Sequence, residues 1–275
     1  MATAVMNRVL TDEEERQFRE QGYLLIKGVL TKEEAQAARD YILGLMPRDL
    51  SIPAHWSNNA GRIKPFKVPG NHTYDTPELI PLMQHEWLYG VAAQLLGSPR
   101  LRVGDGSLGV TLRNSSSGPI LSQNLHLDPS VPGDIDQFLF TPEELQIGGC
   151  FYLSDVHDTG GGIHVVPGGP RLVEARAKAD PQGRQMYNRW KQIQDMPDTV
   201  EVTGEAGDFA LLHHLMPHAA SHNRLPTPRV AQFTRFTRED HAHNPAKPAP
   251  EHRYNETQLA AMTPLGRHLF GVEPW

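Results

Sequence analysis

Residues 207–236 read GDFALLHHLMPHAASHNRLPTPRVAQFTRF, and this stretch decides which fold class we expect. Two short apolar runs, DFALLHH and RVAQFTRF, lie on either side of a segment rich in proline, histidine and asparagine. Short apolar runs separated by turn-forming residues are typical of antiparallel strands. The runs LGVTLR, GGCFYLS and GGIHVVPGG repeat this pattern earlier in the chain. Residues from about 101 to 236 are therefore predicted to form a sandwich or barrel of short strands.

The first hundred residues carry helix signals instead. The segments TDEE at 11–14 and TKEE at 31–34 have the spacing of a capping box at a helix start. We expect the first helix to end near Gly22 and the second near Leu45, with YLLIKGVL as a short strand between them. Residues 78–97, ELIPLMQHEWLYGVAAQLLG, predict a third helix that ends at a glycine.

Helices on the outside of an antiparallel barrel are most simply arranged as one domain, so we expect a mainly β protein with flanking helices over residues 1–275. The helical part covers about 1–100, the strand-rich core about 101–236, and a C-terminal loop and helix 237–275. A polar helical pair around Pro181, RLVEARAKADPQGRQMYNRWKQIQD, is expected to interrupt the core.

The composition excludes several classes of protein. A formal net charge of −6 disfavours bulk binding to nucleic acid or to an acidic membrane, because both need a basic surface. Cys150 is the only cysteine, so neither an intrachain disulfide nor a thiolate metal cluster can form. No leader-like or membrane-length apolar run is present, so a cytoplasmic protein is expected. The oligomeric state is not indicated by the sequence.

Residues 124–128 read NLHLD and suggest a metal site. Side chains at positions i and i+2 of a strand point to the same face, so His126 and Asp128 are expected to project together. Such a pair is either half of a metal site or a buried ion pair. Two histidines and one carboxylate form the facial triad of non-haem iron oxygenases. On spacing alone, the second histidine could be any of four that lie close together: His213, His214, His218 and His222.

At this point the sequence resembles a known family. HLD at 126–128, GGCFYLSDVHDTGGGIHVVPGGP at 148–170 and the stretch at 207–236 are similar to the phytanoyl-CoA dioxygenase family of iron(II)- and 2-oxoglutarate-dependent oxygenases. The resemblance covers about residues 100–236, and more weakly FREQGYLLIKGVLTKEEAQ and LGRHLFGVEPW. It implies a double-stranded β-helix, a jelly roll of the cupin type, with Fe(2+), 2-oxoglutarate and O2 as cofactor and co-substrates.

The resemblance also implies roles for individual residues. His126 and Asp128 match the first two iron ligands of the family. The distal histidine of the family is followed after five residues by asparagine and after eleven by arginine, and only His218, with Asn223 and Arg229, satisfies both spacings. His126, Asp128 and His218 are therefore the expected iron ligands and catalytic centre.

Arg229 is expected to bind the far carboxylate of 2-oxoglutarate, because a guanidinium stays charged and offers a forked set of donors. In PRVAQFTRF, Arg229, Ala231 and Phe233 share one strand face, and Arg229 is predicted to point into the barrel. Thr234 and Arg235 lie further along the strand and are interpreted as barrel wall.

Three features refine the match to the family. Halogenating relatives have a small residue where this chain has Asp128, so the carboxylate favours hydroxylation. A serine that is frequent two residues after the distal histidine is replaced by Ala220, which removes an expected hydroxyl contact to the co-substrate. The usual turn motif appears as Pro-Gly-Gly-Pro at 167–170, without its histidine, and we interpret this difference as one of turn structure.

Weaker candidates surround this centre. Gln123 and Asn223 are expected to contact the co-substrate, although an asparagine at such a turn can equally bond backbone groups. Substrate contacts are expected from Arg113, Tyr74, Lys64 and Lys67, while solvated surface charge is the alternative for the lysines.

The predicted function is hydroxylation of an unactivated C–H bond in a small molecule, with release of succinate and CO2. One alternative is the same chemistry on a peptide or protein side chain. The other is a metal-binding cupin-like protein without redox turnover, and Arg229 argues against it because such a protein needs no carboxylate clamp.

Overall fold

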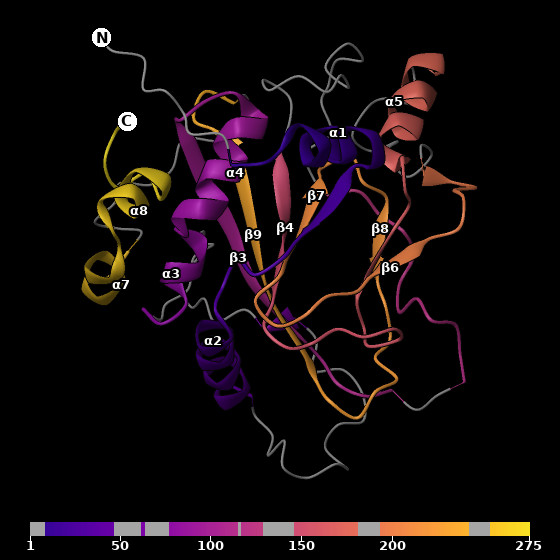
Figure 1. Ribbon diagram of the computed structural model, residues 1–275, viewed down its shortest axis with the longest axis horizontal. Helices are drawn as coiled ribbons and strands as arrows, with labels where there is room; N and C mark the ends of the chain where they lie inside the picture. Colours follow the sequence, from indigo (N-terminus) through magenta and orange to yellow (C-terminus); the bar gives the residue numbers. More distant parts are fainter. Residues whose placement is uncertain are drawn as a thin grey trace.

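Two antiparallel sheets form the centre of the molecule. The computed structural model describes residues 9–46, 77–114, 117–128, 146–180, 193–241 and 254–275, and the backbone of 62–63. The main sheet has the strand order β1-β7-β4-β9-β3-β2, and the minor sheet has the order β6-β5-β8 (Figure 1). The strands are β1 Tyr23–Ile26, β2 Arg62–Ile63, β3 Leu101–Thr111, β4 Ile147–Tyr152, β5 Ile163–Val165, β6 Val200–Val202, β7 Phe209–His213, β8 His218–Ala220 and β9 Arg229–Arg238.

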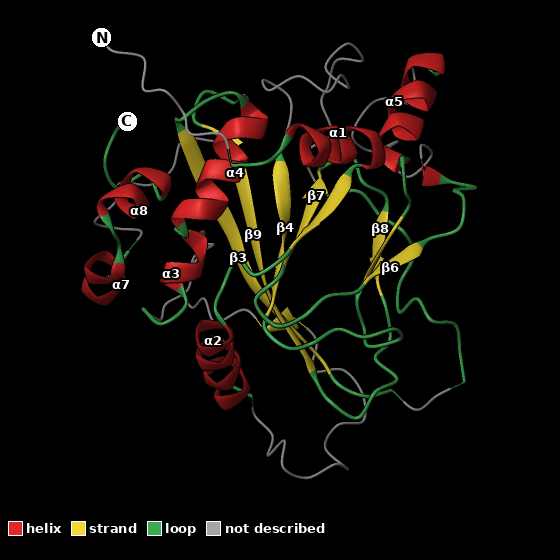
Figure 2. Ribbon diagram, viewed as in Figure 1, coloured by secondary structure: helices red, strands yellow, loops and turns green. Residues whose placement is uncertain are grey.

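This arrangement confirms the predicted fold class. All pairings between neighbouring strands of the two sheets are antiparallel, and the sheets face each other without closing into a barrel, as in a jelly roll (Figure 2). β1, from the predicted helical part, pairs with β7 and so extends the main sheet. The proposed single domain and its internal boundaries remain a prediction.

The helices lie outside the sheets as expected. Most of them cover the main sheet, and the helix at 169–179 packs against Leu127 and Leu215. The helices are α1 Asp12–Gln21, α2 Lys32–Gly44, α3 Ile80–Met83, α4 Glu86–Leu96, α5 Gly169–Ala179, α7 Glu256–Ala261 and α8 Pro264–Leu269. Both predicted capping boxes form, at Thr11 and Thr31, and α1 ends at Gly22 in the left-handed conformation with φ of 80°. None of the described helices is both long and apolar enough to cross a bilayer.

The structure corrects two predicted elements. Residues 78–97 form two helices rather than one, because the chain turns at Gln84 and His85. There the Gln84 amide donates to the carbonyl of Ala261 and accepts from the N–H of Thr263, so a contact from the far end of the chain occupies the break. The strand predicted over 23–30 ends at Ile26. Of the helical pair around Pro181, α5 is present, and residues 181–192 lie outside the described part.

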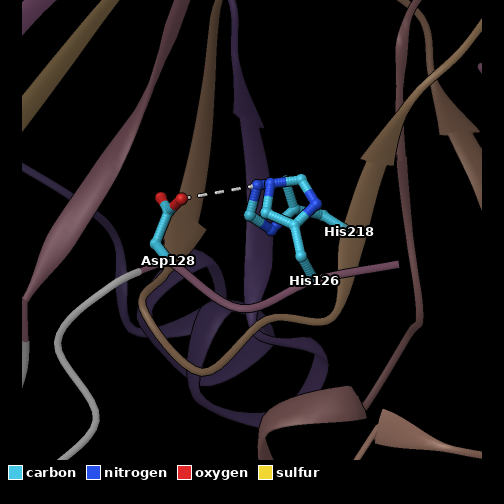
Figure 3. Close-up of side chains that lie close together, drawn as sticks. All are labelled: His126, Asp128 and His218. Carbon is cyan, nitrogen blue, oxygen red and sulfur yellow. Dashed lines mark ion pairs between the residues drawn. The ribbon is translucent and has the colours of Figure 1, made fainter. Parts of the chain in front are cut away.

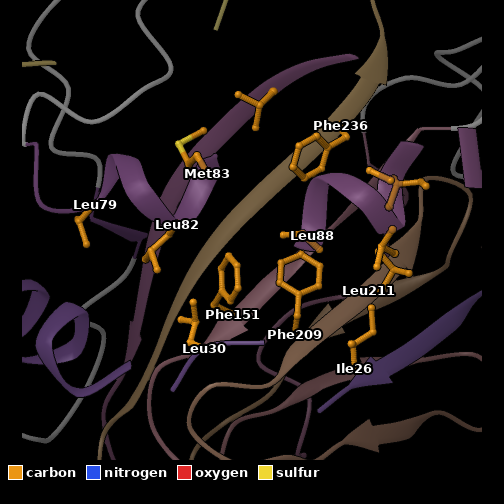
Figure 4. Close-up of a cluster of buried hydrophobic side chains, with 14 of the residues drawn as sticks. Ile26, Leu30, Leu79, Leu82, Met83, Leu88, Phe151, Phe209, Leu211 and Phe236 are labelled. Carbon is orange, nitrogen blue, oxygen red and sulfur yellow. The ribbon is translucent and has the colours of Figure 1, made fainter. Parts of the chain in front are cut away.

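Two apolar clusters separate the faces of the main sheet. On the outer face, Phe151, Phe209 and Phe236 pack beneath the helices (Figure 4). On the inner face, Cys150, Tyr152 and other side chains of the main sheet meet residues of β5 and β6. Consecutive strand residues alternate between these clusters, as Phe151 and Tyr152 do. The side chains that point between the two sheets are therefore the ones that can build an internal site.

Candidate metal centre

Backbone pairing brings His126 and His218 together. His126 donates its N–H to the carbonyl of His218 at 2.9 Å, and His218 donates back to His126 at 3.0 Å. The two residues are thus an antiparallel hydrogen-bonded pair at the end of the minor sheet. Paired residues project their side chains to the same face, and the two imidazole rings lie 4.3 Å apart between centroids (Figure 3).

Asp128 completes a group of three possible metal ligands. Its Oδ1 lies 3.7 Å from Nε2 of His218 (Figure 3). One ligand atom from each of His126, Asp128 and His218 fits within 4.8 Å of the others. Among the described residues this is the one group of three or more histidine, cysteine or acidic side chains with that geometry. All three are partly exposed, so the group is reachable from outside.

A backbone contact sets the proton position on His218. Its Nδ1 lies 2.8 Å from the carbonyl oxygen of Met216. A carbonyl only accepts hydrogen bonds, so Nδ1 carries the proton and Nε2 has a free lone pair. That lone pair belongs to the ring nitrogen beside Asp128. An outer hydrogen bond of this kind is how proteins orient a histidine that ligates a metal.

The other three histidines of the cluster are used elsewhere. His213 and His214 are buried and stack at 4.5 Å between centroids, and burial lowers the pKa of both, to about 3 for His214. His213 lies next to Phe18 on the outer face of the sheet. His222, four residues after His218, hydrogen-bonds through Nδ1 to the side-chain amide of Asn114. Within the described chain, His218 alone joins His126 and Asp128.

Arg229 is buried on the inner face of β9 and has unused donor capacity. It is 3% exposed, and its Nε donates to the carbonyl of Gly161 at 2.8 Å. Gly161 has φ of +86°, a conformation that favours glycine, so the turn aims this carbonyl at the guanidinium. A Cβ on Gly109 would lie 3.1 Å from Nη1, so glycine leaves the room that the guanidinium occupies.

Nη1 of Arg229 provides a test of whether the site suits the co-substrate of this class of enzyme. This buried atom has no hydrogen-bond partner among the residues that the structure describes. A buried cationic donor without an acceptor is costly unless an anion pairs with it. The arrangement fits a carboxylate at Arg229, and the two imidazoles with one carboxylate fit iron(II).

The weaker candidates have different surroundings. Asn223 is fully buried, and its amide donates to the carbonyls of Thr111 and Thr227 and accepts from Leu225. These contacts favour the backbone-bonding alternative, and a co-substrate contact remains a prediction. Arg113 is exposed just beyond β3. Tyr74, Lys64 and Lys67 lie outside the described residues.

Gln123 lies in a bulge beside the metal group. Ser122 pairs with Ala220 and His126 with His218, so four residues on one strand span the same ladder as two on the other. Gln123 is exposed there and lines a surface groove of about 950 Å³, formed by residues 119–125 and 193–196. Its predicted contact with the co-substrate remains a prediction.

The structure shows that Asp128 has a charged neighbour, Arg235, which the sequence pattern had suggested was part of the barrel wall. Arg235 forms an ion pair with Asp128, with 2.5 Å between Nη2 and Oδ2. The signal was present in the sequence, because Arg235 shares the two-residue period of Arg229, Ala231 and Phe233 and so has the same face. Thr234 points to the opposite face, as its neighbours in the strand require.

Solved structures with the same fold support this architecture. The chain has 24% identity to the non-heme alpha-ketoglutarate-dependent carbocyclase SnoK from nogalamycin biosynthesis, with a TM-score of 0.55 over 83% of this chain and 84% of that one. HygX from Streptomyces hygroscopicus, solved with nickel and 2-oxoglutarate, has 17% identity and a TM-score of 0.56 over 84% and 88%. The epimerase SnoN, solved with Fe3+, alpha ketoglutarate and nogalamycin RO, has 17% identity and a TM-score of 0.52 over 82% and 83%. At these identities the likeness shows the fold alone.

A jelly roll with a group of two histidines and one carboxylate defines the class of non-haem iron oxygenases. The model of the phytanoyl-CoA dioxygenase family matches residues 18–231, which is most of the chain. The protein therefore belongs to the phytanoyl-CoA dioxygenase family. It is a 2-oxoglutarate-dependent oxygenase that uses iron(II), 2-oxoglutarate and dioxygen. No curated protein sequence matches it.

Proposed function

We propose that the protein hydroxylates an unactivated C–H bond of a small molecule and releases succinate and CO2. The observation that carries this proposal is the pairing of two features on facing walls. One is the cluster of His126, Asp128 and His218. The other is the buried guanidinium of Arg229, whose Nη1 has no acceptor among the described residues.

His126, Asp128 and His218 would hold the iron. Two neutral imidazoles and one carboxylate would reduce the charge of iron(II) by one unit and leave positions on the ion for 2-oxoglutarate and dioxygen. When bound, iron(II) with 2-oxoglutarate couples reduction of O2 to decarboxylation of the 2-oxo acid and hydroxylation of a C–H bond. Met216 holds the proton of His218 on Nδ1 and keeps Nε2 available as a ligand.

Arg229 would orient the co-substrate. A guanidinium in a buried wall can donate two hydrogen bonds to one carboxylate, and the contact from Gly161 fixes its direction. The apolar cluster on the inner face of the sheet, which includes Tyr152 and Ala231, would limit water near the carboxylate. The co-substrate would thereby be held at both ends.

The nature of the reaction and substrate follows from two further arguments. Asp128 fills the place that a small residue takes in halogenating relatives, which supports hydroxylation. Related folds have been solved with small molecules, namely SnoN with nogalamycin RO and HygX with hygromycin B. Both of these proteins act as precedents for a small-molecule substrate.

The test begins without oxygen. Adding iron(II) and 2-oxoglutarate anaerobically should produce a weak visible charge-transfer band, and admitting air should yield succinate. Asp128→Ala should abolish both signals, whereas Asp240→Ala, which removes an exposed carboxylate paired with Arg238, should leave both unchanged. A wild-type protein that gives neither the band nor succinate would contradict the proposal.

The substrate class is tested separately. Succinate release should rise above its uncoupled background with a member of a panel of small metabolites. Peptides offered in competition should leave that turnover unchanged. Stimulation by peptides in place of metabolites would assign the same chemistry to a protein side chain instead.

A further inference from the structure

Arg235 lies where it can act on the metal site without being a ligand. It projects from the inner face of β9 and pairs with Asp128, and both side chains are partly buried, at 19% and 29% exposure. Its partner Asp128 is one of the three possible metal ligands, and Arg235 lies six residues along the strand from Arg229.

The neighbouring strands leave room for this side chain. In the main sheet Arg235 is opposite Gly104 of β3 on one side and Gly148 of β4 on the other. A Cβ built on Gly148 would lie 3.5 Å from Nε of Arg235, so the guanidinium stem lies against the backbone of β4. With glycine on both sides, Arg235 is the one side chain that these three adjacent positions place on the inner face.

The two oxygens of Asp128 have different partners. Oδ1 lies 3.7 Å from Nε2 of His218, where the metal would bind, and Oδ2 lies 2.5 Å from Nη2 of Arg235. A hydrogen bond between two charged groups is among the stronger contacts of a side chain, so it restrains the carboxylate. One oxygen is thus held by the guanidinium and the other faces the imidazoles.

We propose that Arg235 is a positioning residue that makes Asp128 a ligand through one oxygen. This inference rests on the proposed metal site. Iron(II) with two imidazoles and a single carboxylate oxygen keeps three adjacent positions, which two atoms of 2-oxoglutarate and one O2 would fill. A carboxylate that bound through both oxygens would occupy one of those positions. Arg235 therefore keeps the coordination sphere open.

The experiment counts the water molecules on a bound metal ion. Manganese(II) is added to the purified metal-free protein, and water-proton relaxation reports the number of exchangeable waters on the ion. In Arg235→Met, which removes the donor and retains the apolar stem, Oδ2 loses the hydrogen bond to the guanidinium and we expect one water fewer than in wild type. Affinity for 2-oxoglutarate in the manganese form should fall roughly tenfold, as for loss of an outer-shell contact.

Two further variants separate charge from position. Arg235→Lys keeps a donor that can reach Oδ2, so the wild-type number of waters should return. Arg238→Met is the matched control, because it removes an arginine of the same strand whose partner, Asp240, is an exposed aspartate that is not one of the possible metal ligands. It should behave as wild type.

The outcomes are distinguishable. An unchanged number of waters in Arg235→Met overturns the inference, whatever the affinity does. If Arg235→Met does not fold, the same measurement on Arg235→Gln decides, because glutamine is too short to reach Oδ2. A wild-type protein that binds no manganese contradicts the proposed metal site itself, whereas binding with equal hydration in all variants contradicts the role of Arg235 alone.

Discussion

Replacing Arg229 by methionine should selectively remove 2-oxoglutarate binding. The guanidinium is buried, its Nε donates a hydrogen bond to the carbonyl of Gly161, and its Nη1 has no acceptor among the described residues. A bound carboxylate would accept from that nitrogen, and a hydrogen bond to a charged group contributes about 1.5–3 kcal/mol. The dissociation constant of 2-oxoglutarate should therefore rise roughly ten- to a hundredfold.

Thermal unfolding in the presence of manganese(II) measures this change. At a 2-oxoglutarate concentration 100 times its dissociation constant, a ligand that binds only the folded state stabilises it by about 2.7 kcal/mol. For a chain of this size that corresponds to a rise in melting temperature of roughly 5–10 °C. In Arg229→Met, at the same concentration and with a hundredfold weaker affinity, the rise should be only about 1 °C.

Two controls make the result specific to the carboxylate. The rise caused by manganese alone should be the same in wild type and Arg229→Met, because the proposed ligands His126, Asp128 and His218 are intact. Arg39→Met, which removes a partly exposed arginine on α2 that pairs with Asp40, should retain the full rise with 2-oxoglutarate. An Arg229→Met protein that keeps the full rise would refute the assignment of Arg229 to the co-substrate.

Three further predictions concern stability. His214→Gln should reduce the loss of stability in acid. Burial lowers the pKa of His214 to about 3, so between pH 6.5 and 3 only the unfolded chain takes up this proton. From pH 7 to pH 5 the wild type should therefore lose about 2 kcal/mol more free energy of urea unfolding than the variant, and equal losses in both would exclude this cause. Gly161→Ala should lower the free energy of unfolding by roughly 1–2 kcal/mol, because φ is +86° and the new Cβ would lie 3.1 Å from Cβ of Asn223. The variant should also bind 2-oxoglutarate more weakly, because the carbonyl beside Arg229 moves. Calorimetry that shows unchanged affinity would contradict this second effect. Thr31→Ala should cost about 0.5–2 kcal/mol in chemical unfolding through loss of the capping box, and any change in 2-oxoglutarate affinity would contradict a purely local effect.

Local patterns predicted much of this architecture. The capping boxes at Thr11 and Thr31 depend on residues three positions apart, and both were predicted correctly from the sequence. The alternation of apolar runs with turn residues predicted the antiparallel strands. The continuous helix over 78–97 was wrong because Gln84 is held by residues near the other end of the chain, and no local pattern contains that contact.

For the three possible metal ligands, too, local patterns predicted one part of the arrangement and long-range pairing decides the rest. The two-residue period of a strand predicted that His126 and Asp128 project together, but it left four histidines as the third ligand. Choosing among them depends on which strands pair, and the ladder that sets His218 opposite His126 spans about ninety residues. The family resemblance supplied this choice. The same period would have placed Arg235 on the inner face, yet its partner Asp128 comes from a distant segment.

The bulge before His126 has a consequence for how this site tolerates changes in chain length. Residues added between Ser122 and His126 would lengthen a loop that already bulges from the ladder, and the two imidazoles would stay opposed because their own backbone bonds are unaffected. One residue added between His126 and Asp128 would instead turn the carboxylate to the other side of the strand. Insertions at this bulge would therefore remodel the edge of the groove while His126 and His218 stay opposite each other.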